Sequence, residues 1–193
     1  MIRPAADRDI PEILAIYAPY VEESTATFEY DVPCLKTFTQ RFYAYTAQFP
    51  WLVYEEEGRI LGYAYASAPY ERAAFRWCAE PSVYLRPEAR GKGIAKKLYT
   101  VLEAILHKQG YQVLYALITA ENDASLRFHE KMGYRLQAEF PNCGYKFNRW
   151  LGLVWMEKRI KIVQSPSAFP QSWLSIVQDA ERFTNFLDSL SLS

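Results

Sequence analysis

The sequence predicts an α/β domain built around a mixed β-sheet, and three observations lead to that fold class. The 193 residues are 50% hydrophobic, which is enough for one sizeable core in one domain. Segments with strand and helix periodicity follow each other in the order β-α-α-β-β-β-α-β-α-β-β. A glycine-containing turn over residues 90–93 joins an apolar strand to an amphipathic helix.

The N-terminal part of the chain predicts a short strand and two helices. Residues 2–5 form the strand candidate, and Asp7 or Asp9 can cap a helix whose apolar side chains share one face. Pro19 is expected to kink or end this helix, because proline lacks the N–H that a helix interior needs. Apolar residues recur at helical spacing over 35–45, which predicts the second helix.

Strands and helices then alternate along the chain. Gly58 can supply the positive φ of a hairpin turn, and a long strand is expected over residues 75–85. Gly110 and Gly133 mark the ends of two helices, and Asn122 can cap the second of them. The other strands are expected over residues 51–55, 60–66, 113–118, 134–140 and 150–158.

The turn between the long strand and its helix predicts an anion-binding site. Backbone N–H groups over residues 90–95 can converge beside the positive end of the helix dipole, which suits a phosphate. Gly91 and Gly93 give this turn its conformational freedom. The turn lacks the Lys-Ser/Thr pair of a Walker A loop and the third glycine of the dinucleotide-binding fingerprint.

Two blocks of sequence resemble the GNAT N-acetyltransferase superfamily. The first, Arg90-x-x-Gly93-x-Ala95 after the apolar strand, is similar to its acetyl-coenzyme A (acetyl-CoA) signature. The second, Asn122-x-x-Ser125 followed by His129-Glu-Lys-Met-Gly133-Tyr134, is similar to its second recurring block. The resemblance covers residues 2–158 and implies a GNAT fold, with a mixed, mostly antiparallel central sheet flanked by helices. We expect one acetyltransferase domain over residues 1–160.

A finer similarity points to the group that acetylates phosphinothricin, methionine sulfone and methionine sulfoximine. It is carried by Arg72-x-x-Phe75-x-x-x-x-Glu80-x-Ser82-Val83-Tyr84 and by Gly144-Tyr-Lys146-x-x-Arg149-Trp150-Leu151. The sequence departs from the group where Phe75 replaces a tyrosine, Cys78-Ala79 replaces Thr-Val, Asn148 replaces glycine and Gly152 replaces aspartate. These departures leave the reaction type in place and the identity of the substrate open.

The resemblance implies acetyl-CoA as cosubstrate. An N–H in the segment 83–85 is the implied donor to the oxyanion, if a β-bulge frees it from the sheet. Asn122 either contacts the cofactor or caps its helix, and the two roles are compatible. Arg90, Lys92 and Lys96 either add charge to the phosphate site or are solvated. The implied cofactor-binding residues are Val83, Tyr84, Leu85, Arg90, Gly91, Lys92, Gly93, Ile94, Ala95, Asn122 and Ser125.

The same resemblance implies two catalytic residues. Glu80 matches the group's general base, which takes a proton from the attacking ammonium directly or through a water; the alternative is a solvated surface glutamate. His129 stands where many relatives carry a tyrosine that protonates the departing thiolate; the alternative is a structural histidine. Arg72, Phe28 and Phe75 are the implied substrate residues, of which Arg72 suits a carboxylate or phosphinate.

These residues predict an N-acetyltransferase for a small amino acid or analogue. The alternatives are an acetyltransferase for another small amine and a coenzyme A (CoA) sensor without turnover, which does not need Glu80. Lys146 and Arg149 either line the acceptor pocket or carry charge at a strand start.

Composition limits the partners that we expect. Lys+Arg and Asp+Glu number 22 each, so no global basic field favours nucleic acid or an anionic membrane. Three cysteines and two histidines favour reduced thiols over a disulfide framework or a metal site. The chain start lacks a signal-peptide pattern, and we expect a cytoplasmic protein. Residues 161–193 are expected to form a linker and an amphipathic helix that docks on its own domain or on the partner in a homodimer.

Overall fold

The computed structural model describes residues 1–161, 168–176 and 180–190. Within these ranges it has five α-helices: α1 (Ile10–Glu23), α2 (Leu35–Thr46), α3 (Ile94–Gln109), α4 (Asp123–Lys131) and α5 (Ala180–Ser189). The strands are β1 (Ile2–Pro4), β2 (Trp51–Glu56), β3 (Arg59–Ser67), β4 (Cys78–Leu85), β5 (Val113–Thr119), β6 (Arg135–Lys146) and β7 (Arg149–Arg159). The predicted α/β class with a mixed sheet is confirmed.

All seven strands belong to one sheet, in the order β1-β2-β3-β4-β5-β7-β6. Every neighbouring pair is antiparallel except β4 and β5, which run parallel. That parallel pairing covers only two registers, Cys78 with Val113 and Ala79 with Leu114. Beyond Ala79 the two strands diverge, so the sheet consists of two halves with an opening between them.

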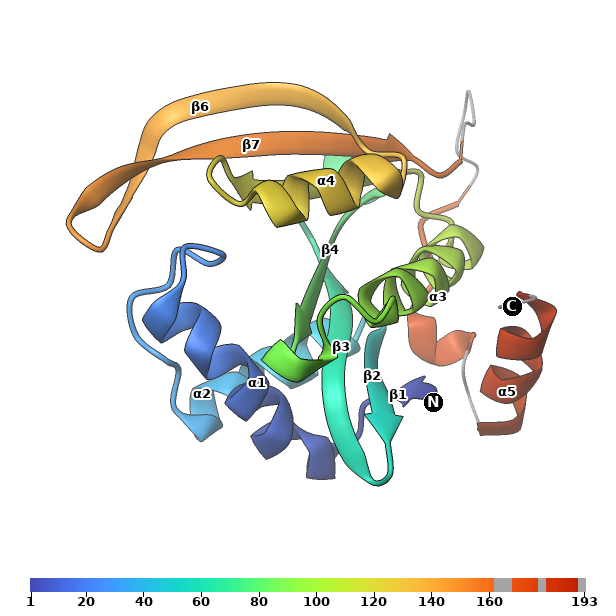
Figure 1. Cartoon of the computed structure of the whole chain (residues 1–193). Coiled ribbons are helices and arrows are strands. Elements are labelled where there is room, and N and C mark those ends of the chain that lie inside the picture. The colour runs from blue at the N-terminus through green and yellow to red at the C-terminus, as the bar shows by residue number, and fades with distance from the viewer. Residues whose placement is uncertain (162–167, 177–179, 191–193) are drawn as a thin grey trace.

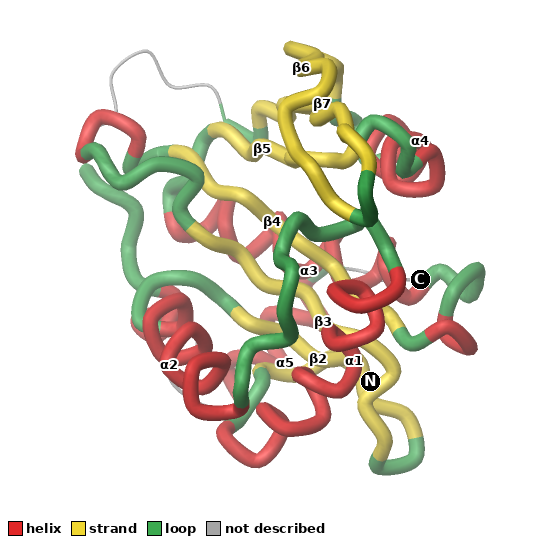
Figure 2. The backbone as a smooth tube through the Cα atoms, turned by 90° about the vertical axis from the view of Figure 1, so that its left-hand side faces the viewer, coloured by secondary structure: helices red, strands yellow, loops and turns green. Residues whose placement is uncertain are grey.

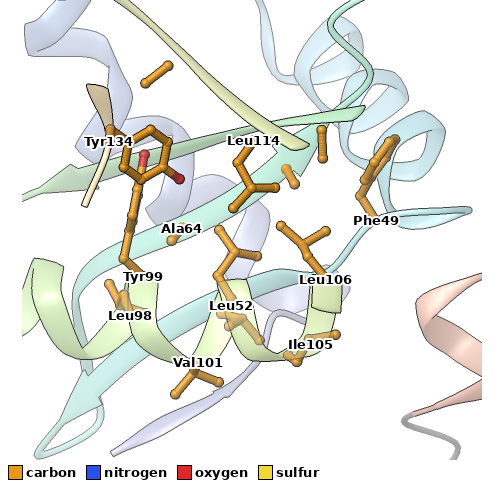
Figure 3. Close-up of a cluster of buried hydrophobic side chains, with 14 of the residues drawn as sticks. Phe49, Leu52, Ala64, Leu98, Tyr99, Val101, Ile105, Leu106, Leu114 and Tyr134 are labelled. Atoms are coloured by element: carbon orange, nitrogen blue, oxygen red, sulfur yellow. The ribbon is translucent and has the colours of Figure 1, made fainter. Parts of the chain in front are cut away.

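Helices cover both faces of the sheet (Figure 1, Figure 2). On one face α1 and α2 pack against odd-numbered residues of β2 and β3, such as Trp51, Val53 and Tyr63. On the other face α3 buries a row of aliphatic side chains against Leu52, Ala64 and Leu114. Figure 3 labels four side chains of that row, Leu98, Val101, Ile105 and Leu106.

Two sequence expectations are corrected. Pro19 does not end α1, which continues to Glu23. The strand expected over residues 75–85 begins only at Cys78, because residues 73–75 form a short 3-10 helix. Phe75 therefore lies in the connection between β3 and β4.

The β2–β3 hairpin has the turn that the sequence predicts, and the β6–β7 hairpin is longer than expected. Glu57 and Gly58 form a two-residue loop with φ of +51° and +77°, the primed turn geometry that matches the strand twist. At the other edge β6 runs beyond the expected residue 140 to Lys146, because the register with β7 shifts between Phe140 and Gly144 and pairing then resumes.

The C-terminal segment packs on the domain. Residues 162–167 and 177–179, which include part of the expected linker and helix, lie outside the described residues. Trp173, in a 3-10 helix, and Phe183, on α5, belong to the same hydrophobic cluster as α3. The division of the chain at residue 160 stays a prediction, since these two side chains contribute to the main core.

We expect Trp173→Ala to destabilise the protein by about 3–5 kcal/mol, the usual cost of truncating a buried aromatic side chain. Trp173 is 5% exposed, and its indole N–H donates to the Thr46 carbonyl oxygen at 2.7 Å. Its neighbour Leu174 is 52% exposed, so Leu174→Ala is the matched control. The measurement is urea unfolding of both variants. Equal, small losses would mean that this segment does not stabilise the core.

Candidate active site

An open cavity of about 450 Å³ lies where β4 and β5 diverge. Its walls are the second half of β4, the end of β5, the starts of α3 and α4, and the end of α1 with the loop that follows. Nine of the residues implied by the resemblance line it together: Glu80, Val83, Tyr84, Leu85, Arg90, Ala95, Asn122, Ser125 and His129.

The glycine turn lies at the start of α3, beside Arg90 and Ala95 of the cavity wall. Gly91 and Gly93 have φ of +75° and +77°, and a Cβ built on either meets no atom within 4 Å. Open space therefore adjoins the backbone at both positions. Lys92 is exposed, whereas Ile94 is 4% exposed and points into the core, so only its backbone faces the turn.

The three implied substrate residues lie outside the cavity lining, so their contact with an acceptor stays a prediction that rests on the resemblance. The ring of Phe28 covers Gly144, where a Cβ would come within 2.5 Å of the ring. Phe75 is 40% exposed and contacts Tyr70, with ring centroids 4.3 Å apart. Arg72 is exposed at the start of the 3-10 helix of residues 73–75.

The backbone of β4 presents one N–H to the cavity. The carbonyl of Pro81 accepts from the Tyr99 hydroxyl at 2.8 Å, and the N–H of Leu85 donates to the Tyr20 hydroxyl at 3.1 Å. Both groups therefore point away from β3. In an antiparallel strand the backbone groups of every second residue face the same side, so the N–H of Val83 also points away from β3. Proline has no N–H and that of Leu85 is bound, which leaves the N–H of Val83 facing the opening.

No β-bulge frees this N–H. The register of β3 with β4 runs without a shift from residue 80 to residue 85, so the expected bulge is absent from this pair. The divergence of β4 from β5 after Ala79 exposes the strand edge instead. The expectation that the segment 83–85 needs a bulge is therefore wrong. The N–H is exposed because β4 and β5 separate.

Glu80 lines the cavity in a poorly solvated environment. Burial raises the pKa of its carboxyl to about 6. Among the described residues no lysine or arginine forms an ion pair with Glu80 to oppose this shift. A carboxylate with a pKa near 6 is ionised at neutral pH and still basic enough to accept a proton.

His129 is 5% exposed, and burial lowers the pKa of its imidazole to about 4. Its Nδ1 lies 2.8 Å from the Ser125 carbonyl oxygen, which can only accept, so a neutral ring carries its proton there. Nε2 lies 3.0 Å from the Tyr99 hydroxyl. Burial thus favours the neutral ring over the imidazolium that the implied acid role needs, and that role stays a prediction.

The remaining cavity residues hold their positions through local contacts. Asn122 caps α4, where its Oδ1 accepts from the N–H of Ser125 at 3.1 Å. The predicted cap is thus present on a residue that also lines the cavity. The guanidinium of Arg90 lies 5.2 Å from the ring centroid of Tyr20, which holds it over the cavity wall.

Sequence reasoning missed Tyr20 and Tyr99. Both lie on helices within apolar patterns, and both hydroxyls bind the open edge of β4. A buried tyrosine needs a partner for its hydroxyl, which was the available signal. The partner itself is a backbone group far away in the chain and cannot be read from local spacing.

Among the described residues no group of three or more His, Cys, Asp or Glu is placed to hold a metal ion. No described helix combines the length and the apolar character needed to cross a membrane.

Comparison with known proteins gives consistent matches over most of the chain. The family described as acetyltransferase (GNAT) domain matches residues 2–155. A phosphinothricin N-acetyltransferase of Alcaligenes faecalis is 37% identical over 81% of both chains. An L-methionine sulfoximine/L-methionine sulfone acetyltransferase of Pseudomonas paraeruginosa is 36% identical over 85% of this chain and 96% of its own length.

A solved structure agrees with these relatives. The crystal structure of a GNAT superfamily phosphinothricin acetyltransferase from Sinorhizobium meliloti, in complex with AcCoA, matches with a TM-score of 0.81 and 34% identity. The match covers 89% of this chain and 92% of that one. The expected fold, with its mostly antiparallel mixed sheet between helices, is confirmed, and the chain belongs to the GNAT acetyltransferase family.

Proposed function

We propose that the protein transfers an acetyl group from acetyl-CoA to the amine of a small amino acid or analogue, with Glu80 as general base. The observation that carries the proposal is the position of Glu80, whose carboxyl has a raised pKa and lines the same cavity as the open edge of β4. Relatives named for phosphinothricin and for methionine sulfoximine and sulfone support the acceptor class.

The cavity residues fit acetyl-CoA. Gly91 and Gly93 leave open space beside a helix N-terminus, which suits phosphate oxygens, and Arg90 adds a cation nearby. Asn122 and Ser125 line the opposite wall at the start of α4. When bound, acetyl-CoA supplies an activated acetyl thioester, and the chain's own residues bind it, orient it and handle the protons.

The chain supplies a base and an oxyanion donor in one cavity. An amino acid enters largely as an ammonium, which has no lone pair for attack, so Glu80 takes its proton directly or through a water. The N–H of Val83 is our candidate for the donor to the oxygen that gains negative charge. Both groups belong to β4, so one rigid strand sets the spacing between them.

We assign His129 a positioning role in place of proton donation. Its low pKa leaves it neutral, and it contacts the Tyr99 hydroxyl that binds the edge of β4. The departing thiolate needs no dedicated acid, since a thiol with a pKa of about 8.5 can take its proton from solvent near neutral pH.

Two further expectations stay predictions. A homodimer is supported by five large apolar side chains that are exposed on the β6–β7 hairpin: Leu136, Phe140, Tyr145, Phe147 and Trp150. Sedimentation equilibrium would decide whether the dimer forms. A cytoplasmic location is supported by reduced cysteines, since no cysteine among the described residues is in a disulfide. Fractionation of the source cells would test it.

Glu80→Gln should lower kcat/KM by about 10²–10⁴-fold at neutral pH, because it removes the base without changing its shape. In the parent, kcat/KM should rise with pH as the carboxyl, whose pKa is raised to about 6, loses its proton. Glu80→Gln should lose that rise. Glu56→Gln, on the distant β2–β3 hairpin, is the control. Full turnover by Glu80→Gln near pH 7 would refute the assignment.

Gly93→Ala should weaken CoA binding, measured by calorimetry. Its φ of +77° makes a side chain strained by about 1–2 kcal/mol, and the new methyl group would enter the proposed phosphate space. Gly58 has the same φ and the same open surroundings in the β2–β3 hairpin, so Gly58→Ala costs similar stability at a site remote from the cofactor. Equal CoA affinity in the two variants contradicts a phosphate role for the turn.

Arg72→Ala should impair acetylation of amino acids far more than of amines without a carboxylate, because it removes a guanidinium clamp. Thiol release from acetyl-CoA with both kinds of amine measures this, and the same panel tests the alternatives. Turnover only with carboxylate-free amines would favour the second acceptor class. No turnover with any amine, together with tight CoA binding, would favour a sensor. Equal impairment on both kinds of amine would exclude the clamp.

A further inference from the structure

Lys146, the last residue of β6, is a buried lysine with 2% of its surface exposed. Its Nζ donates to the carbonyl oxygens of Val21 at 2.7 Å, Ser24 at 2.9 Å and Thr27 at 2.9 Å. An ammonium group has three N–H donors, so these acceptors satisfy it completely. The acceptors lie 119 to 125 residues away in sequence, at the end of α1 and in the loop that follows.

The electrostatics of this contact explain why a lysine is buried here. The last turn of α1 contains no basic residue, and its carbonyl groups carry the negative end of the helix dipole. Val21 is one of the last four residues of α1, whose carbonyls lack partners within the helix. Among the described residues no carboxylate forms an ion pair with Lys146, so the ammonium depends on these backbone oxygens.

The loop that Lys146 holds is a wall of the cavity. Its residues 24–26 line the cavity together with the start of α4. The carbonyl of Thr25 also accepts from the hydroxyl of Thr119 at the end of β5, and the ring of Phe28 rests on Gly144. Figure 1 shows this loop, in blue after α1, rising toward the β6–β7 hairpin.

We propose that Lys146 is a positioning residue that fixes the loop over residues 24–28 and thereby shapes the acceptor side of the cavity. The inference rests on the proposed acetyl transfer. Lys146 has no free donor for the substrate, so it acts through the loop and not on the reacting atoms. None of the three acceptors of Lys146 belongs to α3 or α4, whose starts form the cofactor side.

The experiment compares four variants with the parent. Lys146→Met keeps the length of the side chain and removes all three donors, whereas Lys146→Arg keeps the charge and several donors. Thr119→Val removes the hydrogen bond from the Thr119 hydroxyl to the loop with little change of shape. Arg135→Met removes an exposed cation from the same strand and is the control.

The readouts separate positioning from general damage. For Lys146→Met we expect kcat/KM for the amine to fall on the order of 10²-fold, as misplacement near a reaction centre does. CoA affinity by calorimetry should stay unchanged, Lys146→Arg should restore part of the loss, and Thr119→Val should show a smaller loss of the same kind. The proposal would be overturned if kcat/KM for the amine and the affinity for CoA fell equally, or if kcat/KM for the amine did not fall.

Two further outcomes are decisive. If Lys146→Met does not fold, Thr119→Val decides: a raised KM for the amine alone supports the proposal, and unchanged kinetics overturn it. If the parent acetylates no amine, the proposed function fails. In that case amide hydrogen exchange over residues 24–28 still tests the loop, because this measurement needs no turnover. Unchanged protection of these amides in both Lys146→Met and Thr119→Val would refute the role of Lys146.

Discussion

The divergence of β4 from β5 is the constraint on which the rest of the site depends. A strand edge inside a protein must find partners for its N–H and C=O groups, because unpaired buried groups are costly. Here two tyrosine hydroxyls bind the ends of the exposed segment, at Pro81 and Leu85, and the N–H of Val83 between them faces the cavity. These two tyrosines therefore leave only the middle of the exposed segment, at Val83, open to the cavity.

The order of elements could be predicted from the sequence because it depends on local chemistry. Gly58, Gly110 and Gly133 all have positive φ where a turn or helix end was expected, and Asn122 forms the expected cap. Pro19 does not end α1 because packing of the apolar face of the helix outweighs the loss of one hydrogen bond. Phe75 was misread because an apolar residue beside a strand gives no signal for a 3-10 turn.

The residues of the candidate site could be predicted from the sequence, but the burial that shifts their pKa values could not. Glu80 and His129 were both singled out, yet the shift of each pKa comes from burial by segments distant in sequence. Desolvation acts in opposite directions on the two groups, raising the pKa of an acid and lowering that of a base, so it changes their chemistry in different ways. For Lys146 the sequence left a role in the acceptor pocket and a charge at a strand start both open, because its three acceptors belong to another part of the chain.

The short junction between the two halves of the sheet has a thermodynamic consequence. Only two residue pairs connect β4 to β5, and the cavity beyond them has one wall from each half. A molecule that fills the cavity therefore bridges both halves, and its binding is linked to their association. By mass action such a bridge stabilises the folded chain by about 2.7 kcal/mol when the free ligand exceeds its Kd a hundredfold. A bound ligand thus adds one more link between the two halves, beside the hydrophobic core that α3 forms with both of them.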